Sequence, residues 1–205
     1  MPAIFRKKMQ QPSASCFFSL NISKEHKKLR CMENSFINTL KSRRSCRHYQ
    51  PQQITDEELN AVLEAGTWAP TAHGAQDPVI VAVQNAELRQ ELVALNARVR
   101  GGSADPYYGA PTLVLVFVSA NNENGLQDGS CVLQNMMLAA HALGLGSCWI
   151  NREIQMFNMP EGKELMQKMG LPEGLAGVGA ISLGYEATEP AAPKPRKADY
   201  FRIIR

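Results

Sequence analysis

The stretch Asp128–Ile150, DGSCVLQNMMLAAHALGLGSCWI, decides how the fold is interpreted. Residues 128–143 are nearly all nonpolar or small, which predicts a helix that is buried on all sides, either within a core or against a partner. Gly144-Leu145-Gly146 is expected to end this helix, and Ser147–Ile150 predicts a short strand. A buried helix followed directly by a strand indicates a layered domain that contains both kinds of element.

Further strands and helices are predicted on both sides of this stretch. Thr112–Val118 is a continuous nonpolar run rich in β-branched residues, typical of a strand covered on both faces. The sequence also predicts strands at Val79–Val83 and Gly177–Gly184, and helices near Phe36–Leu40, after Thr55, across Leu88–Val99 and over Pro160–Met169. This order of elements predicts an α/β or α+β domain.

Two expected boundaries follow from local signals. Thr55 with Glu58 three residues later forms a capping-box pattern that begins a helix, and Gly66 is expected to end it. The proline-containing tail after Glu189 is expected to become β-like at Tyr200–Ile204.

The composition excludes several classes of protein. The chain has 205 residues, of which 44% are hydrophobic and 20% charged, which is typical of one globular domain. The longest purely nonpolar run, Leu113–Val118, is far shorter than the roughly 20 residues of a membrane span, so no membrane association is expected. Five cysteines without metal-ligand spacing argue against a disulfide scaffold or a zinc ribbon, and no metal site is expected.

The net charge of +3 conceals two regions of opposite sign. Residues 1–31 hold seven Lys or Arg and a single acid, Glu25, so the rest of the chain is net negative. A nucleic-acid-binding protein carries its basic excess on the folded body, so no nucleic-acid partner is expected. Residues 1–31 predict a poorly ordered basic extension before a domain over residues 32–205; the alternatives are an organelle transit peptide or an upstream start codon ahead of Met32.

Two basic clusters are candidates for binding an anion. Arg43-Arg44-Ser45-Cys46-Arg47 follows a predicted helix, and guanidinium groups bind phosphate and carboxylate in a bidentate manner. Lys194-Pro195-Arg196-Lys197 lies on a segment that proline keeps extended. The alternative for the first cluster is a solvated basic turn, and for the second an ordinary basic tail.

The loop Trp68–Gln76 is a third candidate, because long connections of small and polar residues often carry sites. Its His73 is either a proton donor or an inert surface residue. Cys131 and Cys148 lie on nonpolar segments and are expected to be inert thiols of the core. Gly177–Ser182 begins like a dinucleotide-binding fingerprint, but Ser182 occupies the third glycine position.

Taken in order, five segments resemble the nitroreductase family of FMN-dependent oxidoreductases. They are RRSCRHY at Arg43–Tyr49, APTAHGAQ at Ala69–Gln76, GAP at Gly109–Pro111, the helix and strand over Gln134–Trp149, and LGY at Leu183–Tyr185 with the basic tail. The resemblance covers the chain from about Phe36 onward. It implies an α+β fold with a mixed central sheet flanked by helices, and a homodimer with one FMN in each of two clefts between the subunits.

The resemblance also implies which residues bind FMN. Arg43, Arg44 and Ser45, together with Lys194 and Arg196, correspond to the positions that hold the phosphate and ribityl chain, and Arg47 to a cation near the N1/O2 edge of the ring. Pro70, Thr71 and Ala72 correspond to the loop of the other subunit that packs on the ring. Asp128 corresponds to a polar position near the flavin. The strand end beside the ring corresponds to Trp149, Ile150 and Asn151.

The implied activity is that of a cytoplasmic NAD(P)H oxidoreductase. NAD(P)H would reduce FMN in the first half of a ping-pong cycle, and a nitroaromatic, quinone or related small acceptor would be reduced in the second. Because the flavin carries the chemistry, no catalytic side chain is expected. The alternatives are a specialised branch of the family (enone or enamine reduction, dehalogenation, or flavin fragmentation) and a dimer that binds flavin without turnover.

Three departures from the family pattern concern the acceptor more than FMN. Gly74 replaces a usual asparagine, and Asp77-Pro78 replaces a frequent Pro-Trp pair, so a charge is expected near the flavin. The insertion that often covers the cleft is expected to be reduced to about residues 97–109.

Overall fold

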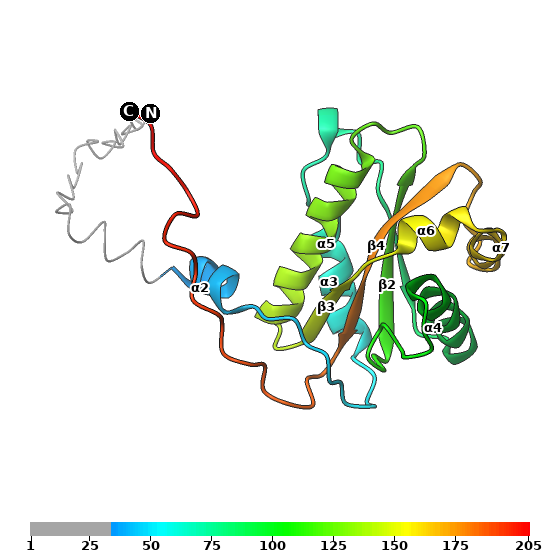
Figure 1. Cartoon of the computed structure of the whole chain (residues 1–205), viewed down its shortest axis with the longest axis horizontal. Helices are drawn as coiled ribbons and strands as arrows, with labels where there is room; N and C mark the ends of the chain where they lie inside the picture. Colours follow the sequence, from blue (N-terminus) through cyan, green and yellow to red (C-terminus); the bar gives the residue numbers. More distant parts are fainter. Residues whose placement is uncertain (1–33) are drawn as a thin grey trace, which may run out of the picture. The chain divides into compact units, whose positions relative to one another are not determined.

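A computed structural model describes residues 34–205 (Figure 1). Residues 38–205 form one compact unit. The predicted basic extension over residues 1–31 lies outside the described residues. Helix α2, Ser35–Ser42, is present where the pattern around Phe36–Leu40 predicts it. Among the described residues, no helix has both the length and the nonpolar character that crossing a membrane requires.

Four strands form the central sheet in the order β1-β2-β4-β3. Their bounds are Val79–Val83 for β1, Thr112–Ser119 for β2, Gly146–Ile150 for β3 and Leu175–Gly184 for β4. All three neighbouring pairs are antiparallel, and parallel pairing in the described chain is limited to an isolated bridge between Ser45 and Ser147. The α+β prediction is therefore confirmed, and the central sheet is antiparallel throughout, whereas the resemblance implies a mixed sheet.

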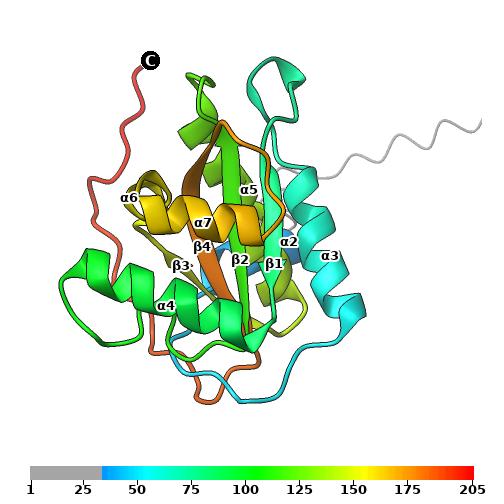
Figure 2. The ribbon, with the colours of Figure 1, turned by 90° about the vertical axis from the view of Figure 1, so that its right-hand side faces the viewer.

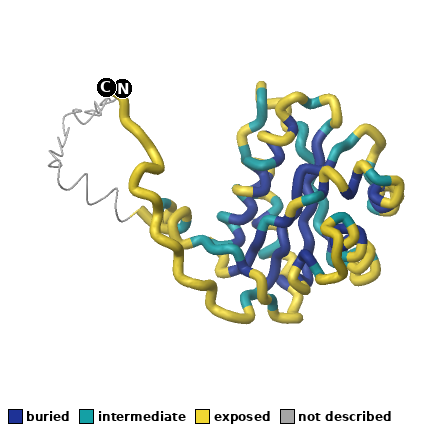
Figure 3. Tube along the Cα trace, in the orientation of Figure 1, coloured by how far each residue is buried: buried dark blue, intermediate teal, exposed yellow. Residues whose placement is uncertain are grey.

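Helices cover both faces of the sheet (Figure 2). One core layer joins α3 (Asp56–Thr67) and α5 (Gly125–Ala142) to one face, and the other joins α4 (Ala86–Arg100), α6 (Glu153–Asn158) and α7 (Pro160–Lys168) to the opposite face. Side chains of β2 alternate between the layers, so that Leu115 and Phe117 pack on one side and Val114 and Val116 on the other. The prediction that this strand is covered on both faces is confirmed, and buried residues follow it through the centre of the domain (Figure 3).

Helix α5 differs from its prediction in two respects. It begins at Gly125, three residues before the predicted start at Asp128. It is buried only along the face that packs on the sheet and α3, whereas Leu126, Gln134 and Leu143 are exposed in this chain. Burial on all sides by a core of the same chain is therefore wrong, and burial against a partner stays a prediction.

Gly66 does not end α3. The capping box at Thr55 and Glu58 begins the helix as predicted, but the helix continues to Thr67. A Cβ on Gly66 would lie 2.8 Å from Cγ of Met136 and 2.9 Å from Cδ1 of Ile80. Glycine is needed here because α3, α5 and β1 approach one another closely, a reason that the local sequence does not reveal.

Two further segments were not predicted correctly. Helix α6 was missed, because a six-residue helix has too few turns to show a periodicity. The expected β-like segment at Tyr200–Ile204 contains no strand and is exposed, since no strand edge of the described chain pairs with it.

Candidate functional site

The two basic clusters of the sequence meet in one pocket of about 330 Å³, called here the basic pocket. Its lining residues are Arg43, Arg44, Ser45, Arg47, Ala191, Ala192, Pro193, Lys194 and Arg196. Five of them are cationic and none is acidic, although they come from opposite ends of the described chain. Such a concentration of positive charge favours an anionic ligand.

The first cluster is held along the outer edge of β3. The backbone N–H of Cys46 donates to the carbonyl of Ser147 over 2.9 Å. The Tyr49 hydroxyl donates to the carbonyls of Cys46 and Ser182, over 2.9 and 3.2 Å. Burial raises the pKa of Tyr49, so this hydroxyl keeps its proton and remains a donor. The sheet therefore fixes the backbone from which the arginines project.

The second cluster reaches the pocket because the chain after β4 follows the first. The N–H of Gln50 donates to the carbonyl of Tyr185, and the N–H of Ala187 donates to the carbonyl of His48, both over 2.9 Å. This short antiparallel pairing directs the following residues towards Arg43. Lys194 and Arg196 thereby line the pocket from the other side.

Two buried donor atoms of the basic pocket have no hydrogen-bond acceptor in the described part of the chain. Nη1 of Arg43 and Nε of Arg44 are buried and have no hydrogen-bond partner among the described residues. Burial is the main cause that lowers the pKa of Arg43, and the neighbouring Arg44 adds to it. A buried donor without a partner costs on the order of 1–3 kcal/mol, more when it is charged. A phosphate bound here would supply the missing acceptors.

Arg47 is paired with an aromatic side chain. Its Cζ lies 5.8 Å from the centroid of the Tyr108 ring, within the range of a cation–π contact. The contact with Tyr108 raises the pKa of Arg47, so the guanidinium stays charged.

The predicted loop residues lie with Asp128 rather than with the arginines. The N–H of Ala72 donates to Oδ1 of Asp128 over 3.0 Å, and Oδ2 of Asp128 lies 3.4 Å from Nδ2 of Asn122. Asp128 is buried, and the N–H of Gln76 donates to the Thr71 hydroxyl over 3.0 Å. Asp128 therefore anchors the loop that contains Pro70–Ala72.

These two groups lie at opposite ends of α5. Near its C-terminus, Oγ of Ser42, one residue before Arg43, is 2.7 Å from Nε2 of His141. Near its N-terminus, Asp128 holds the loop. At 1.5 Å per residue, the helix separates Asp128 from His141 by about 20 Å. Within one chain, the structure does not bring Pro70–Ala72 and Asp128 to the basic pocket.

The strand-end residues belong to β3 and to the turn after it. Trp149 is half-buried and the side chain of Ile150 is buried in the core, so this side chain does not reach a ligand. Asn151 is exposed, and its carbonyl accepts a hydrogen bond from Nδ2 of Asn96 over 3.1 Å.

Comparison with known proteins identifies the family. The sequence model of the Nitroreductase family matches residues 40–185, which is more than half of the chain. The chain belongs to the nitroreductase family. The segments that carry the resemblance fall within this range, except for the basic tail, which follows it at Lys194–Lys197.

Curated relatives and solved structures agree with this family. The chain is 30% identical to an Archaeoglobus fulgidus protein named for NADH dehydrogenase or NAD(P)H nitroreductase activity, over 72% of this chain and 83% of that protein. It is 29% identical to the NADPH-flavin oxidoreductase of Vibrio harveyi, over 80% and 70% of the respective lengths. A Bacteroides fragilis nitroreductase solved with bound FMN is 33% identical, with a TM-score of 0.77 over 84% of this chain and 100% of that chain.

One departure of this chain from the family pattern has a structural role. Oδ2 of Asp77 accepts hydrogen bonds from the N–H of Ser119, over 3.0 Å, and from Nδ2 of Asn122, over 2.9 Å. Its carboxylate therefore ties the start of β1 to the end of β2, and the expectation that Asp77 places a charge near the flavin stays a prediction. His73 is exposed, with a left-handed φ of 55° in the 3-10 turn Ala72–Gly74.

Sequence reasoning missed the side chains that support the site. Tyr49 and Tyr108 position the arginines, and Asn96 holds the Asn151 carbonyl. The aromatic residues at 107 and 108, directly before Gly109–Pro111, were the available signal. Within residues 34–205, no cluster of three or more His, Cys, Asp or Glu could hold a metal ion.

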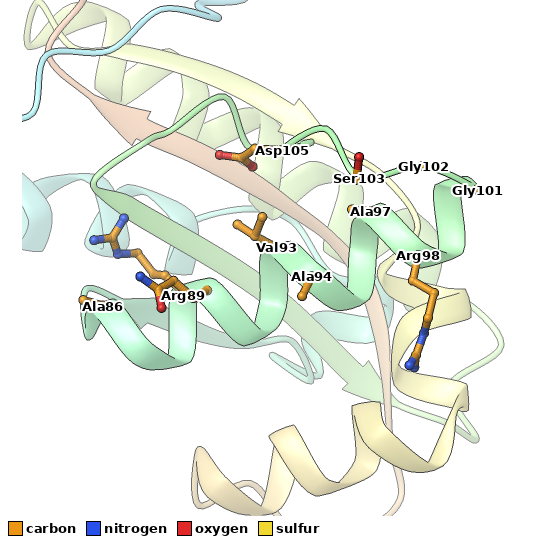
Figure 4. A pocket seen from close by; sticks show the side chains of 11 residues that line it. Ala86, Arg89, Val93, Ala94, Ala97, Arg98, Gly101, Gly102, Ser103 and Asp105 are labelled. Carbon is orange, nitrogen blue, oxygen red and sulfur yellow. The ribbon is translucent and has the colours of Figure 1, made fainter.

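A larger cavity of about 760 Å³ lies along α4 and the loop that follows it (Figure 4). Nonpolar residues such as Val93, Ala94 and Ala97 line it, with Arg89 and Asp105 at its edges. It contains none of the predicted site residues.

Proposed function

We propose that this chain is an FMN-dependent oxidoreductase that uses NAD(P)H to reduce nitroaromatics, quinones or related small acceptors by a ping-pong mechanism. Two relatives are named for NAD(P)H- or NADPH-dependent reduction, and two structures at 33% and 26% identity contain FMN. The observation that carries the proposal is the basic pocket, in which two remote basic clusters converge.

The basic pocket fits the phosphate of FMN. A phosphate monoester carries close to two negative charges at neutral pH and offers three acceptor oxygens. The unpartnered Nη1 of Arg43 would donate to it, with Ser45, Lys194 and Arg196 completing the coordination. Arg44 has fewer donors left for the phosphate, because its Nη1 already donates to the carbonyls of Lys41 and Arg43.

Arg47 is the residue best placed to act on the flavin ring. When bound, FMN supplies the group that accepts and passes on the hydride equivalent. Arg47 lies on the same strand-like segment as Arg43, four residues further on, and Tyr108 holds its guanidinium. A fixed cation at the N1/O2 edge stabilises the negative charge that reduction places there. The chain's contribution is thus binding, orientation and electrostatics.

We also infer that the active form is a homodimer. Pro70–Ala72 and Asp128 lie about one α5 length away from the basic pocket of their own chain. A two-fold axis that packs α5 antiparallel to its copy would bring the loop of one chain to the basic pocket of the other. The exposed Leu126 on α5, Leu143 directly after it, and Trp68 beside the loop would be buried by this packing. Sedimentation equilibrium of the purified protein tests this directly.

A cytoplasmic location is the remaining part of the proposal. Cys46, Cys131 and Cys148 are free thiols among the described residues, which is typical of a reducing compartment. Reduced nicotinamide cofactors are consumed in the same kind of compartment.

An anaerobic reduction experiment tests the function. The FMN-loaded protein is mixed with NADH or NADPH under nitrogen, and the visible flavin absorbance is followed. We expect rapid bleaching by at least one donor and recovery of the colour when a nitroaromatic or a quinone is added. A protein that stays yellow with both donors would be a flavin-binding dimer without turnover.

A further inference from the structure

A buried polar cluster around Glu153 lies outside the basic pocket and has no role in the proposed function. Glu153 is 0% exposed at the start of α6. Its Oε1 accepts a hydrogen bond from the Tyr107 hydroxyl over 3.0 Å and lies 3.4 Å from Nδ2 of Asn96. Its Oε2 is buried with no hydrogen-bond partner among the described residues. A carboxyl group in this setting is costly to ionise, so the cluster needs an explanation.

Two lines of contact connect this cluster to the candidate site. Tyr107, which bonds Glu153, precedes Tyr108, whose ring faces the guanidinium of Arg47. Asn96 contacts Glu153 and also donates to the carbonyl of Asn151 at the end of β3. Glu153 is therefore connected through these contacts to Arg47 and to Asn151, the two positions proposed to flank the flavin ring.

Hydrogen bonds from Asp105 tie the loop that contains Tyr107 into a small unit. Oδ1 of Asp105 accepts from the N–H of Tyr107 and Oδ2 from the N–H of Gly109, both over 2.7 Å, which ties residues 105–109 together. Figure 4 places Asp105 on this loop beside α4. Tyr108 has a left-handed φ of 60°, and Arg152, directly before Glu153, has a φ of 91°. Left-handed backbone at such residues costs on the order of 1–3 kcal/mol and persists only where neighbouring contacts hold it.

Glu153 changes its charge near neutrality. Burial raises its pKa to about 7, against the opposing effects of the Tyr107 hydroxyl and Arg152. The titratable or charged groups that face the cluster are Tyr107 from the loop, Arg152 from the preceding turn, and Asp105, which acts on Tyr107. From α4 it meets the neutral Asn96, and from β4 the neutral Gly177, which packs on the Glu153 backbone.

The two protonation states place different demands on the loop. The neutral carboxyl suits a site without water, and its Oε1 accepts from Tyr107. The ionised carboxyl leaves Oε2 charged, buried and unpaired, which costs far more free energy than burying the neutral carboxyl does. Water reaches that oxygen only if a neighbouring segment shifts, and residues 105–109 are the segment joined to the carboxyl, through the hydroxyl of the buried Tyr107.

We propose that Glu153 is a positioning residue whose neutral carboxyl fastens residues 105–109 over the end of β3, and whose ionisation releases them. The fastened loop holds Tyr108 against Arg47, and Asn96 against the Asn151 carbonyl. Release loosens both contacts and weakens the hold on the ring. Only this last connection, to the flavin, rests on the proposed function.

Hydrogen exchange tests the loop movement without any ligand. Exchange of residues 105–110 is compared at pH 6 and pH 8 between the wild type, Glu153→Gln and the control Glu161→Gln, an exposed acid of α7 paired with Arg98. We expect exchange in the wild type to be at least about threefold faster than in Glu153→Gln at pH 8, and this ratio to be smaller at pH 6, because only the wild type ionises and its ionised fraction grows with the pH. Glu161→Gln should follow the wild type. Equal exchange in the wild type and Glu153→Gln at both pH values overturns the proposal.

Tyr107→Phe provides a second variant that keeps the packed ring. It removes the hydroxyl that joins the loop to Glu153, so its loop should exchange faster than that of the wild type already at pH 6. Exchange equal to that of the wild type at pH 6 would show that the hydrogen bond from Tyr107 to Glu153 does not hold the loop in place. This result would overturn the proposal even if Glu153→Gln fails to fold.

FMN titrations test the connection to the site. The ratio of the wild-type Kd to the Glu153→Gln Kd is measured at pH 6 and pH 8, since the phosphate group, which titrates near pH 6, affects both proteins alike. We expect a ratio near one at pH 6 and an increase of about threefold at pH 8. A ratio that does not change with pH overturns the connection. If the wild type binds no FMN at either pH, the proposed function fails, and hydrogen exchange still decides the role of Glu153.

Discussion

The N–H of Ala72 donates to Oδ1 of Asp128, so the loop after α3 is fastened to the first turns of α5 by a buried carboxylate. The same carboxylate lies near Asn122, whose amide also binds Asp77. One connected set of side chains therefore holds the loop, the start of α5 and the ends of β1 and β2. Helix α5 carries this assembly at one end and the Ser42–His141 contact, beside the arginines, at the other.

Replacing Asp128 by alanine is expected to destabilise the fold. The N–H of Ala72 would lose its acceptor, which costs about 1–3 kcal/mol for a buried donor. Urea unfolding followed by circular dichroism measures the change. Asp128→Asn is the matched control, because its side-chain oxygen can still accept from Ala72, and it should cost less. Equal losses for the two variants would contradict the role given to the hydrogen bond.

Replacing Gly66 by alanine is expected to cost about 1–3 kcal/mol, because the new methyl group would overlap Met136 and Ile80. Thermal and urea unfolding both report this loss. Gly102→Ala is the control, since a Cβ there meets nothing within 4 Å. If Gly66→Ala is as stable as Gly102→Ala, the close approach of α3, α5 and β1 is not as tight as the structure has it.

The stability of the ligand-free protein should depend on the pH through Glu153. Its pKa is about 7 in the folded state against 4.5 for an ordinary glutamate, so the folded state binds this proton more tightly. The stabilisation is complete below about pH 4.5 and is lost as the pH rises through 7, by roughly 3 kcal/mol at most.

The measurement is the free energy of unfolding at several pH values between 5 and 8. The wild type should lose stability over this range relative to Glu153→Gln, which has no proton to release. Glu58 and Glu161, whose pKa values are lowered by hydrogen bonds, act in the opposite direction at lower pH and are unchanged in both proteins. Parallel curves for the two proteins would contradict the assignment.

Much of the fold could be predicted because its signals are local. The capping box at Thr55, the nonpolar run of β2 and the stripe of α4 each depend on near neighbours in the sequence. Gly66 was misinterpreted because its reason lies in Met136, 70 positions away and on another helix. The exposed face of α5 was missed because a nonpolar sequence does not say whether its own chain or a partner covers it.

The candidate site could be predicted in part for a similar reason. Each basic cluster was visible as a motif, and the resemblance to the family predicted that they converge, which the basic pocket bears out geometrically. The support from Tyr108 and the Glu153 cluster was not foreseen, since these contacts exist only after the loop folds over β3. The hydrogen bonds of Asp77 could not be predicted, because its partners, Ser119 and Asn122, are remote in sequence.

The most direct test of the central claim compares FMN with riboflavin, which lacks the phosphate. Fluorescence titrations give the Kd of each ligand for the wild type and for Arg43→Ala. We expect Arg43→Ala to weaken FMN binding by at least about tenfold, as the loss of a charged hydrogen bond predicts, and to leave riboflavin binding nearly unchanged. If Arg43→Ala binds FMN as tightly as the wild type does, or loses both ligands equally, the basic pocket is not the phosphate site and the account is wrong.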